Sequence, residues 1–262
     1  MRKEWLIILL VMLVGAAGGW NHWRGRIAGV QTEKISRVRG IVLPHHELAG
    51  EIVMRSLERL AQTQDFSHIV IFSPNHFQPD SYTFSTADKI KDLPLDTKYL
   101  RELKEMDANA VWDQKLLENE HGVLIPAGYL KNYFPRASFL PIIFSPYFNQ
   151  ERLDKMAGWL AQAMPADTLF VVSVDFAHEK MAEEAALKNL ETIETIKNRD
   201  YQRLFGYGND HLDSPAAMGT WMMTTEKLEA KNWETWYDSH GAMLTDNPLL
   251  NGTSYVIGVF TD

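Results

Sequence analysis

One segment of the chain, residues 168–174, reads Thr-Leu-Phe-Val-Val-Ser-Val and shows no regular alternation of apolar and polar side chains. Such a run is typical of a strand that is covered on both faces, as the strands of parallel sheets are. Apolar strands are also predicted at 40–43, 68–72 and 138–144, and helical patterns separate most of them. The sequence therefore predicts an α/β fold, with a central mixed or mostly parallel sheet and helices on both faces.

The remaining elements follow from the same periodicities. Helices are predicted over about 47–61, 97–105, 150–164, 179–204 and 215–228, with another starting near 120, and the last strands near 233–238 and 254–260. The helix over 179–204 rests on apolar residues at helical spacing, and Ser214 followed by Pro215 is a typical helix start. A polar stretch that ends at residue 84 is predicted to pair as a hairpin.

Composition excludes several classes of protein. The chain has 262 residues, a net charge of −8 and no cysteine. Its length suits one large α/β domain or two small ones, and we predict a single domain. Without cysteine it has no thiolate nucleophile and no iron–sulfur cluster, so any metal must be held by nitrogen and oxygen. Because no Lys and Arg cluster is interleaved with aromatic residues, we expect no nucleic-acid binding.

The N-terminus has the pattern of an export signal. Arg2 and Lys3 precede an uncharged, mostly apolar stretch, and the next charges are Arg24 and Arg26. Residues 1–23 are predicted to be a signal peptide or a membrane anchor: the small residues 17–19 suit cleavage, while the uncharged run approaches the ~20 residues that span a bilayer. Either form would be exported, with membrane contact only through this segment. We predict a linker at 24–39 and the folded domain at 40–262.

Three histidines follow predicted strands at the point where each strand ends. They are His45, His76 and His178. A single histidine in such a place is more often a hydrogen-bonded structural residue, but the carboxyl ends of parallel strands meet at one edge of a sheet. Because neighbouring parallel strands are ~4.8 Å apart, His45 and His76 are predicted to converge on one metal ion.

Asp175 precedes His178 in Asp-Phe-Ala-His, directly after the most apolar strand. A carboxylate that leaves a buried strand is costly unless it is paired, coordinated or hydrogen-bonded. Asp175 is therefore predicted to orient His178 as an acid or base, with capping of the following helix as the alternative.

Other candidates lie near predicted helix starts. Glu120-His121 opens one helix, and His211 and Asp213 lie before another, where Asp213 has helix capping as its alternative role. His46 and Glu47 are further candidates, and Glu47 equally suits the first turn of a helix. The chain has neither a phosphate-binding glycine loop nor a Gly-x-Ser-x-Gly nucleophile motif.

Five short segments, taken in order, resemble one family. They are Ile41-Val42-Leu43-Pro44-His45, Ser73-Pro74-Asn75-His76, Glu120-His121, Ser173-Val174-Asp175-Phe176-Ala177-His178 and residues 254–260. Together they resemble the Memo-like proteins, which include protein B of the AmmeMemoRadiSam system and are related in fold to the LigB-type class III extradiol dioxygenases. The resemblance extends over nearly the whole predicted domain.

The resemblance implies a metal site that contains His45 and His76. The family's third ligand lies in a loop before a late helix, where this chain offers His211, with Asp213 as the alternative. Two histidines and a carboxylate with open positions suit Fe(II), and zinc and copper are the alternatives. The resemblance places His121, Asp175 and His178 in the cavity as catalytic or supporting groups.

This chain departs from the family around the site. His46-Glu47-Leu48 replaces Ala-Gly-Tyr, and Leu124 and Pro126 replace a Glu and a His, so the substrate is not carried over. We expect a metal-dependent, dioxygenase-like oxidoreductase that acts on a small molecule or a peptide. The alternatives are a non-catalytic module that binds a peptide or partner, and a metal-assisted hydrolase with Glu47 or Asp175 as base.

Overall fold

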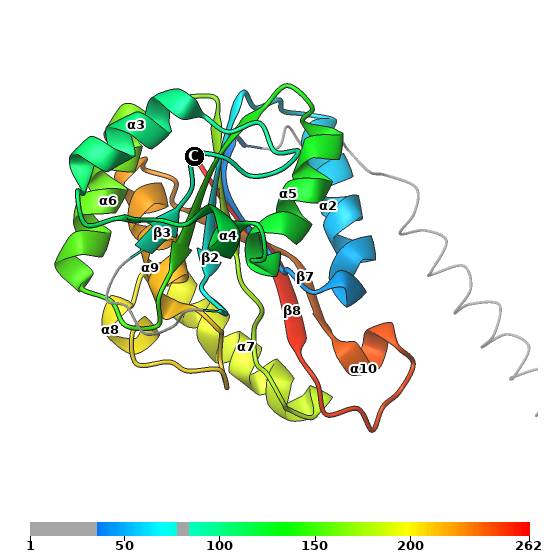
Figure 1. Cartoon of the computed structure of the whole chain (residues 1–262). Coiled ribbons are helices and arrows are strands. Elements are labelled where there is room, and N and C mark those ends of the chain that lie inside the picture. The colour runs from blue at the N-terminus through cyan, green and yellow to red at the C-terminus, as the bar shows by residue number, and fades with distance from the viewer. Residues whose placement is uncertain (1–35, 78–83) are drawn as a thin grey trace, which may run out of the picture. The chain divides into compact units, whose positions relative to one another are not determined.

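The computed structural model describes residues 36–77 and 84–262, which form one α/β domain (Figure 1). Its sheet has the strand order β4-β3-β5-β2-β6-β1-β8-β7. The strands are β1 (Val38–Leu43), β2 (His68–Pro74), β3 (Phe84–Thr86), β4 (Val111–Trp112), β5 (Ser138–Phe144), β6 (Thr168–Ser173), β7 (Asn232–His240) and β8 (Ser254–Thr261). The central strands β5, β2, β6 and β1 run parallel, whereas β3 and β8 run antiparallel to their inner neighbours. The predicted mixed sheet is thereby confirmed.

Helices cover both faces of this sheet. They are α2 (Gly50–Ala61), α3 (Thr97–Met106), α4 (Gln114–Leu117), α5 (His121–Tyr133), α6 (Gln150–Ala163), α7 (Ala182–Lys197), α8 (Tyr201–Leu204), α9 (Pro215–Lys227) and α10 (Gly241–Leu244), with a 3-10 turn at Glu47–Ala49. The pair α2 and α5 lies on one side, and α3, α6 and α9 lie on the other (Figure 1). The sheet is therefore the middle layer of three.

The buried strand β6 packs directly against a helix. All of its residues are buried, as the unbroken apolar pattern predicts. Helix α9 packs against it through Trp221, which is fully buried and donates its Nε1–H to the Phe170 carbonyl at 2.9 Å. A buried indole needs such a partner, so this bond fixes α9 against the sheet.

The parallel strands bring their carboxyl ends to one edge. In the register, Leu43 of β1 aligns with Ser173 of β6, and Phe72 of β2 aligns with Val172 of β6. Strand β6 thus lies between β1 and β2, although the sequence suggested that the histidines follow neighbouring strands. The segments after β1 and β2 meet across the end of β6.

The predicted single helix over 179–204 is wrong. Helix α7 ends at Lys197, and α8 begins at Tyr201. Between them, Arg199 has a φ of 53°, which is uncommon for a residue with a side chain. Its half-buried guanidinium donates to the Met222 carbonyl and, at 2.8 Å, to the Ala230 carbonyl. These contacts with the end of α9 stabilise the break.

Two further predictions fall at the edges of the described residues. The hairpin predicted for the polar stretch that ends at residue 84 lies largely outside the described residues, and strand β3, which begins at Phe84, pairs with β5 and β4. Strand β1 begins at Val38, within the predicted linker. The predicted signal or anchor, residues 1–23, lies outside the described residues. None of the helices within 36–77 and 84–262 is long and apolar enough to span a bilayer.

Candidate metal centre

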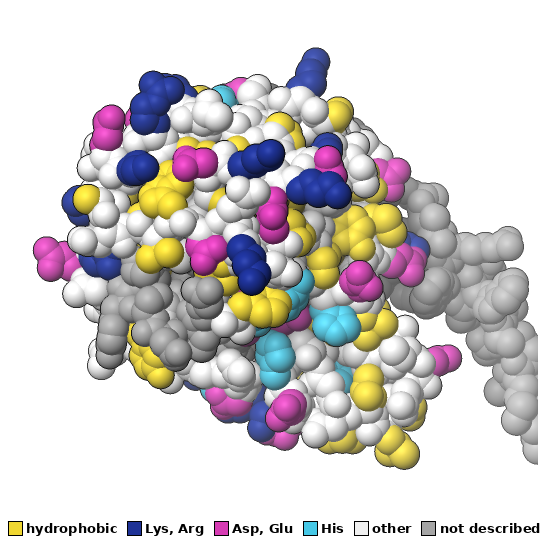
Figure 2. Space-filling view, viewed as in Figure 1, with side chains coloured by type: hydrophobic (Ala, Val, Ile, Leu, Met, Phe, Trp, Pro, Cys, Tyr) yellow, Lys and Arg dark blue, Asp and Glu magenta, His cyan; other side chains and the backbone are white. Residues whose placement is uncertain are grey.

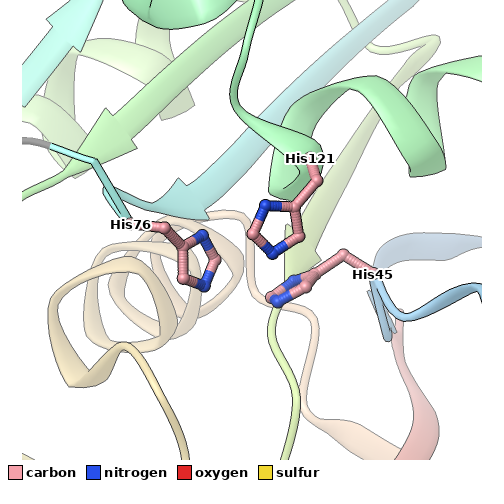
Figure 3. A group of neighbouring side chains, drawn as sticks. All are labelled: His45, His76 and His121. Atoms are coloured by element: carbon pink, nitrogen blue, oxygen red, sulfur yellow. The ribbon is translucent and has the colours of Figure 1, made fainter.

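Three histidines from three separate elements meet at the carboxyl edge of the sheet. His45 follows β1, His76 follows β2, and His121 is the first residue of α5 (Figure 3). One ring nitrogen from each lies within 4.8 Å of the others. The ring centroid of His45 is 5.0 Å from that of His76 and 5.2 Å from that of His121. Imidazole nitrogens this close can share one metal ion.

His45 is the buried member of this group. Its backbone N–H donates to Asp175 Oδ1 at 3.2 Å, and its ring Nδ1 lies 3.2 Å from Ser173 Oγ, so the end of β6 orients the ring. The other ring nitrogen, Nε2, lies 3.2 Å from Asp213 Oδ2 and 3.8 Å from Asp175 Oδ2. A histidine held through one nitrogen presents the other to a metal.

Glu120 fixes His76 in the same way. Glu120 Oε1 accepts a 2.7 Å bond from His76 Nδ1, and Oε2 accepts the His76 backbone N–H at 2.9 Å. Oε1 also accepts the Gly122 N–H at 3.0 Å, so the same carboxylate caps α5. Burial alone would raise the pKa of Glu120, but the hydrogen bonds from His76 hold this pKa below its ordinary value.

Asp213 brings a carboxylate to the same place. Besides its contact with His45, Oδ2 lies 4.0 Å from His76 Nε2 and accepts the Asp175 N–H at 3.2 Å. Oδ1 is buried and has no hydrogen-bond partner among the described residues. Burial alone would raise the pKa of Asp213, but His45 outweighs it and lowers this pKa. An ionised, buried carboxylate with an unused oxygen fits a cation ligand.

The pKa of Asp175 is shifted in the opposite direction to that of Asp213. Burial raises its pKa against the effect of His45, and the charge of Asp213 adds to the rise. Burial also opposes a charge on His45, but Asp175 and Asp213 together outweigh it and raise the pKa of His45 to about 9. In the metal-free protein the two carboxylates therefore stabilise a protonated His45.

His178 lies outside the group of three histidines, but its charge acts to lower the pKa values of both Asp175 and Asp213. Its backbone N–H donates to the Asn209 carbonyl at 2.9 Å, while its ring Nδ1 is buried without a hydrogen-bond partner in the described part of the chain. This position suits proton transfer or a polar contact next to the metal centre.

The structure does not bring His211 to this group. Its Nε2 lies 3.0 Å from Glu191 Oε2, its Nδ1 lies 3.1 Å from Asp210 Oδ1, and its ring stacks on Tyr207 at 3.9 Å. In the same loop, Asp213 is tied inwards because its N–H donates to the Asp175 carbonyl. Asp213 is therefore the residue of this loop that faces the histidines.

The extra candidates beside His45 have structural roles. The His46 side chain accepts the Leu48 N–H at 3.2 Å and caps the short turn, and Glu47 is the acidic residue in the first part of that turn. Glu120 is the site residue that the sequence left without a role. Its signal was its position at a helix start directly before a candidate histidine.

On the surface, several histidine side chains and an acidic side chain gather in one place near the lower middle of Figure 2. His121 is the most open of the three, with 44% of its side chain exposed, against 28% for His76 and 3% for His45. Partial burial and the neighbouring His76 and His45 lower the pKa of His121. A half-exposed imidazole, whose neutral form is favoured by its surroundings, thus forms one outer side of the group.

Comparison with known proteins assigns the family. A family model described as Memo-like protein matches residues 24–231, most of the chain. The chain belongs to the Memo-like family. A search of curated proteins gives no match. The crystal structure of the uncharacterized protein JW3007 from Escherichia coli K12 is similar, with a TM-score of 0.60 and 12% identity over 86% of this chain and 100% of that chain. At this identity the likeness shows a shared fold.

Proposed function

We propose that this Memo-like protein binds one divalent metal ion through His45, His76 and His121, with Asp213 as an oxygen ligand. The observation that carries the proposal is the position of Asp213. Its Oδ2 faces the Nε2 atoms of His45 and His76, and its Oδ1 lacks a partner among the described residues. A metal ion would satisfy this buried carboxylate and both imidazoles together.

Fe(II) is the metal we expect. Imidazole nitrogens and a carboxylate oxygen both suit non-haem iron, and the open side next to His121 leaves room for further ligands. Zinc and copper are the alternatives, because imidazole binds both. When bound, Fe(II) would supply redox chemistry with oxygen, which makes a dioxygenase-like oxidoreductase the leading candidate.

The surrounding residues have separate tasks in this proposal. Glu120 keeps the His76 Nδ1 protonated and its Nε2 free, and Ser173 orients His45. Asp175, whose pKa is raised, can hold a proton near the reacting atoms. His178 can pass a proton to or from a substrate, since its charge acts on both aspartates and its Nδ1 has no hydrogen-bond partner among the described residues. The substrate is a small molecule or a peptide.

Metal analysis of purified protein tests the centre. We expect stoichiometric metal in the wild type and its loss in His45→Ala and His76→Ala. His211→Ala is the matched control, because its ring contacts Glu191 and Asp210 and should not affect metal content. Stoichiometric metal in both ligand variants would contradict the proposal.

A metal-assisted hydrolase is the second candidate function, and Asp175 favours it. A buried carboxyl group with a raised pKa beside the metal ligands could serve as a base. Model esters separate the two activities, because hydrolysis proceeds without oxygen. A non-catalytic binding module on the same fold would instead hold little metal, and its partner binding would survive both histidine substitutions.

We also propose that the protein is exported. The support is the charge pattern of residues 1–23, with Arg2 and Lys3 before an uncharged stretch. Fractionation of cells that express the full chain tests this, with an N-terminal tag and a C-terminal tag compared to separate a cleaved signal from a retained anchor. Recovery of the intact chain in the cytoplasm would contradict the proposal.

A further inference from the structure

An exposed aromatic side chain borders the metal centre. Phe77 directly follows His76, and 55% of it is exposed. Its ring meets His121 edge-on, with 6.1 Å between the ring centroids. Covering a large apolar side chain with a ligand is favourable, so an exposed ring that adjoins a hollow can contribute to ligand binding.

A hollow of about 280 Å³ adjoins this ring. It is lined by Phe77, Asp113, Lys115, Leu116 and Asn119. Phe77 and Leu116 supply its apolar surface, while the single Lys and the single Asp carry opposite charges. Asp113 is already engaged, since its Oδ1 accepts the Leu116 N–H at 2.9 Å. The hollow therefore offers an apolar wall without a net charge.

The metal centre itself offers no cationic anchor beyond the metal. The ion pairs of its carboxylates, Glu120, Asp175 and Asp213, are all with histidines, and no Lys or Arg within the described residues pairs with them. Sites that recognise phosphate or carboxylate groups on a ligand usually place Arg or Lys there. A substrate with a second anionic group directly beside its metal-binding atom would meet these acidic side chains instead.

The exposure of the side chains around the site indicates from which side a ligand can approach it. His45 and Asp213 are buried, whereas His121 and Phe77 are open to solvent. A ligand that approaches from this open side comes close to Phe77, whose ring centroid is 6.1 Å from that of His121.

We propose that the substrate carries an uncharged, apolar group next to its metal-binding atom, and that Phe77 contacts this group at the mouth of the hollow. This inference rests on the proposed metal centre. It names a class of substrate by its chemistry: compounds with a metal-binding head and an apolar neighbouring portion, as opposed to small polyanions.

Hydroxamic acids test the inference, because a constant head group can bind the metal while the tail varies. The probes are acetohydroxamic acid, hexanohydroxamic acid and the same six-carbon chain ending in a carboxylate. Calorimetric titration of metal-loaded protein measures each affinity. The hexanoyl probe is expected to bind at least about tenfold more tightly than the acetyl probe, since its added methylenes leave water. The carboxylate-ended probe is expected to lose most of this gain.

Variants then assign the effect to Phe77. Phe77→Ala should abolish the difference between hexanoyl and acetyl probes, and Phe77→Leu should restore most of it. Leu187→Ala, which removes a similarly exposed apolar side chain from α7, is the control and should change nothing. Equal affinities of the two uncharged probes for the wild type would overturn the inference. So would a preference for the carboxylate-ended probe. Failure of every hydroxamate to bind, or absence of metal, would count against the metal centre itself.

Discussion

Glu120 accepts a 2.7 Å hydrogen bond from His76 Nδ1 and also caps the helix that presents His121. One fully buried carboxylate thus connects two proposed ligands that come from different elements. Such a partner sets the tautomer and the orientation of a ligating imidazole. The metal affinity of the proposed centre should therefore depend on Glu120, although Glu120 is not itself a proposed ligand.

Glu120→Gln is predicted to weaken metal binding by about 10- to 100-fold, the usual effect of removing a carboxylate partner from a ligating histidine. The amide keeps the size of the side chain, and its oxygen can still accept one hydrogen bond. Competition with a chelator measures the affinity. Glu191→Gln, at the partner of His211, is the control. Equal affinities of Glu120→Gln and the control would show that Glu120 does not support His76.

The sequence predicted His211 as the third metal ligand, whereas the proposed centre uses His121, and a pair of variants tests which of the two binds the metal. His121→Ala is predicted to weaken metal binding by about tenfold or more, because it removes one direct donor. His211→Ala should keep the wild-type affinity. The measurement is the dissociation constant of the same metal for both variants, with circular dichroism to confirm folding. The reverse order of affinities would restore His211 as the ligand.

Local sequence patterns predicted much of the fold. Strand β5 has the predicted bounds, and the unbroken apolar run of β6 correctly indicated a strand buried on both faces. Recurrence at strand ends also drew attention to His45 and His76, which lie in one cluster. These features depend on residues close in sequence, so the pattern alone can reveal them.

The remaining features depend on contacts between distant residues. His121 reaches the cluster because Glu120 binds the backbone and ring of His76, 44 positions away. Helix α7 stops where Arg199 binds the carbonyl groups of Met222 and Ala230. The apolar spacing alone does not reveal that break, although Asp200, which caps α8 by accepting the Arg203 N–H, is a local signal of a new helix start.

Metal affinity is predicted to rise with pH. In the metal-free protein the carboxylates of Asp175 and Asp213, acting against burial, raise the pKa of His45 from 6.5 to about 9. A metal ion must displace this proton, so the apparent affinity should increase by about tenfold per pH unit below pH 9 and then level off. Titrations at pH 6.5, 7.5 and 8.5 give the slope. An affinity that is constant over this range would contradict the protonation of His45.

Arg199→Ala is predicted to destabilise the fold by about 3 kcal/mol, because it removes several partly buried hydrogen bonds from a charged donor. The guanidinium also lies 3.7 Å from the ring centroid of Phe260, so the packing around β8 loses a contact as well. Denaturant unfolding measures the change. Arg136→Ala, which breaks only an exposed pair with Asp65, should cost less than about 1 kcal/mol. If the two variants lose similar stability, the contacts between Arg199 and the end of α9 do not hold the break between α7 and α8.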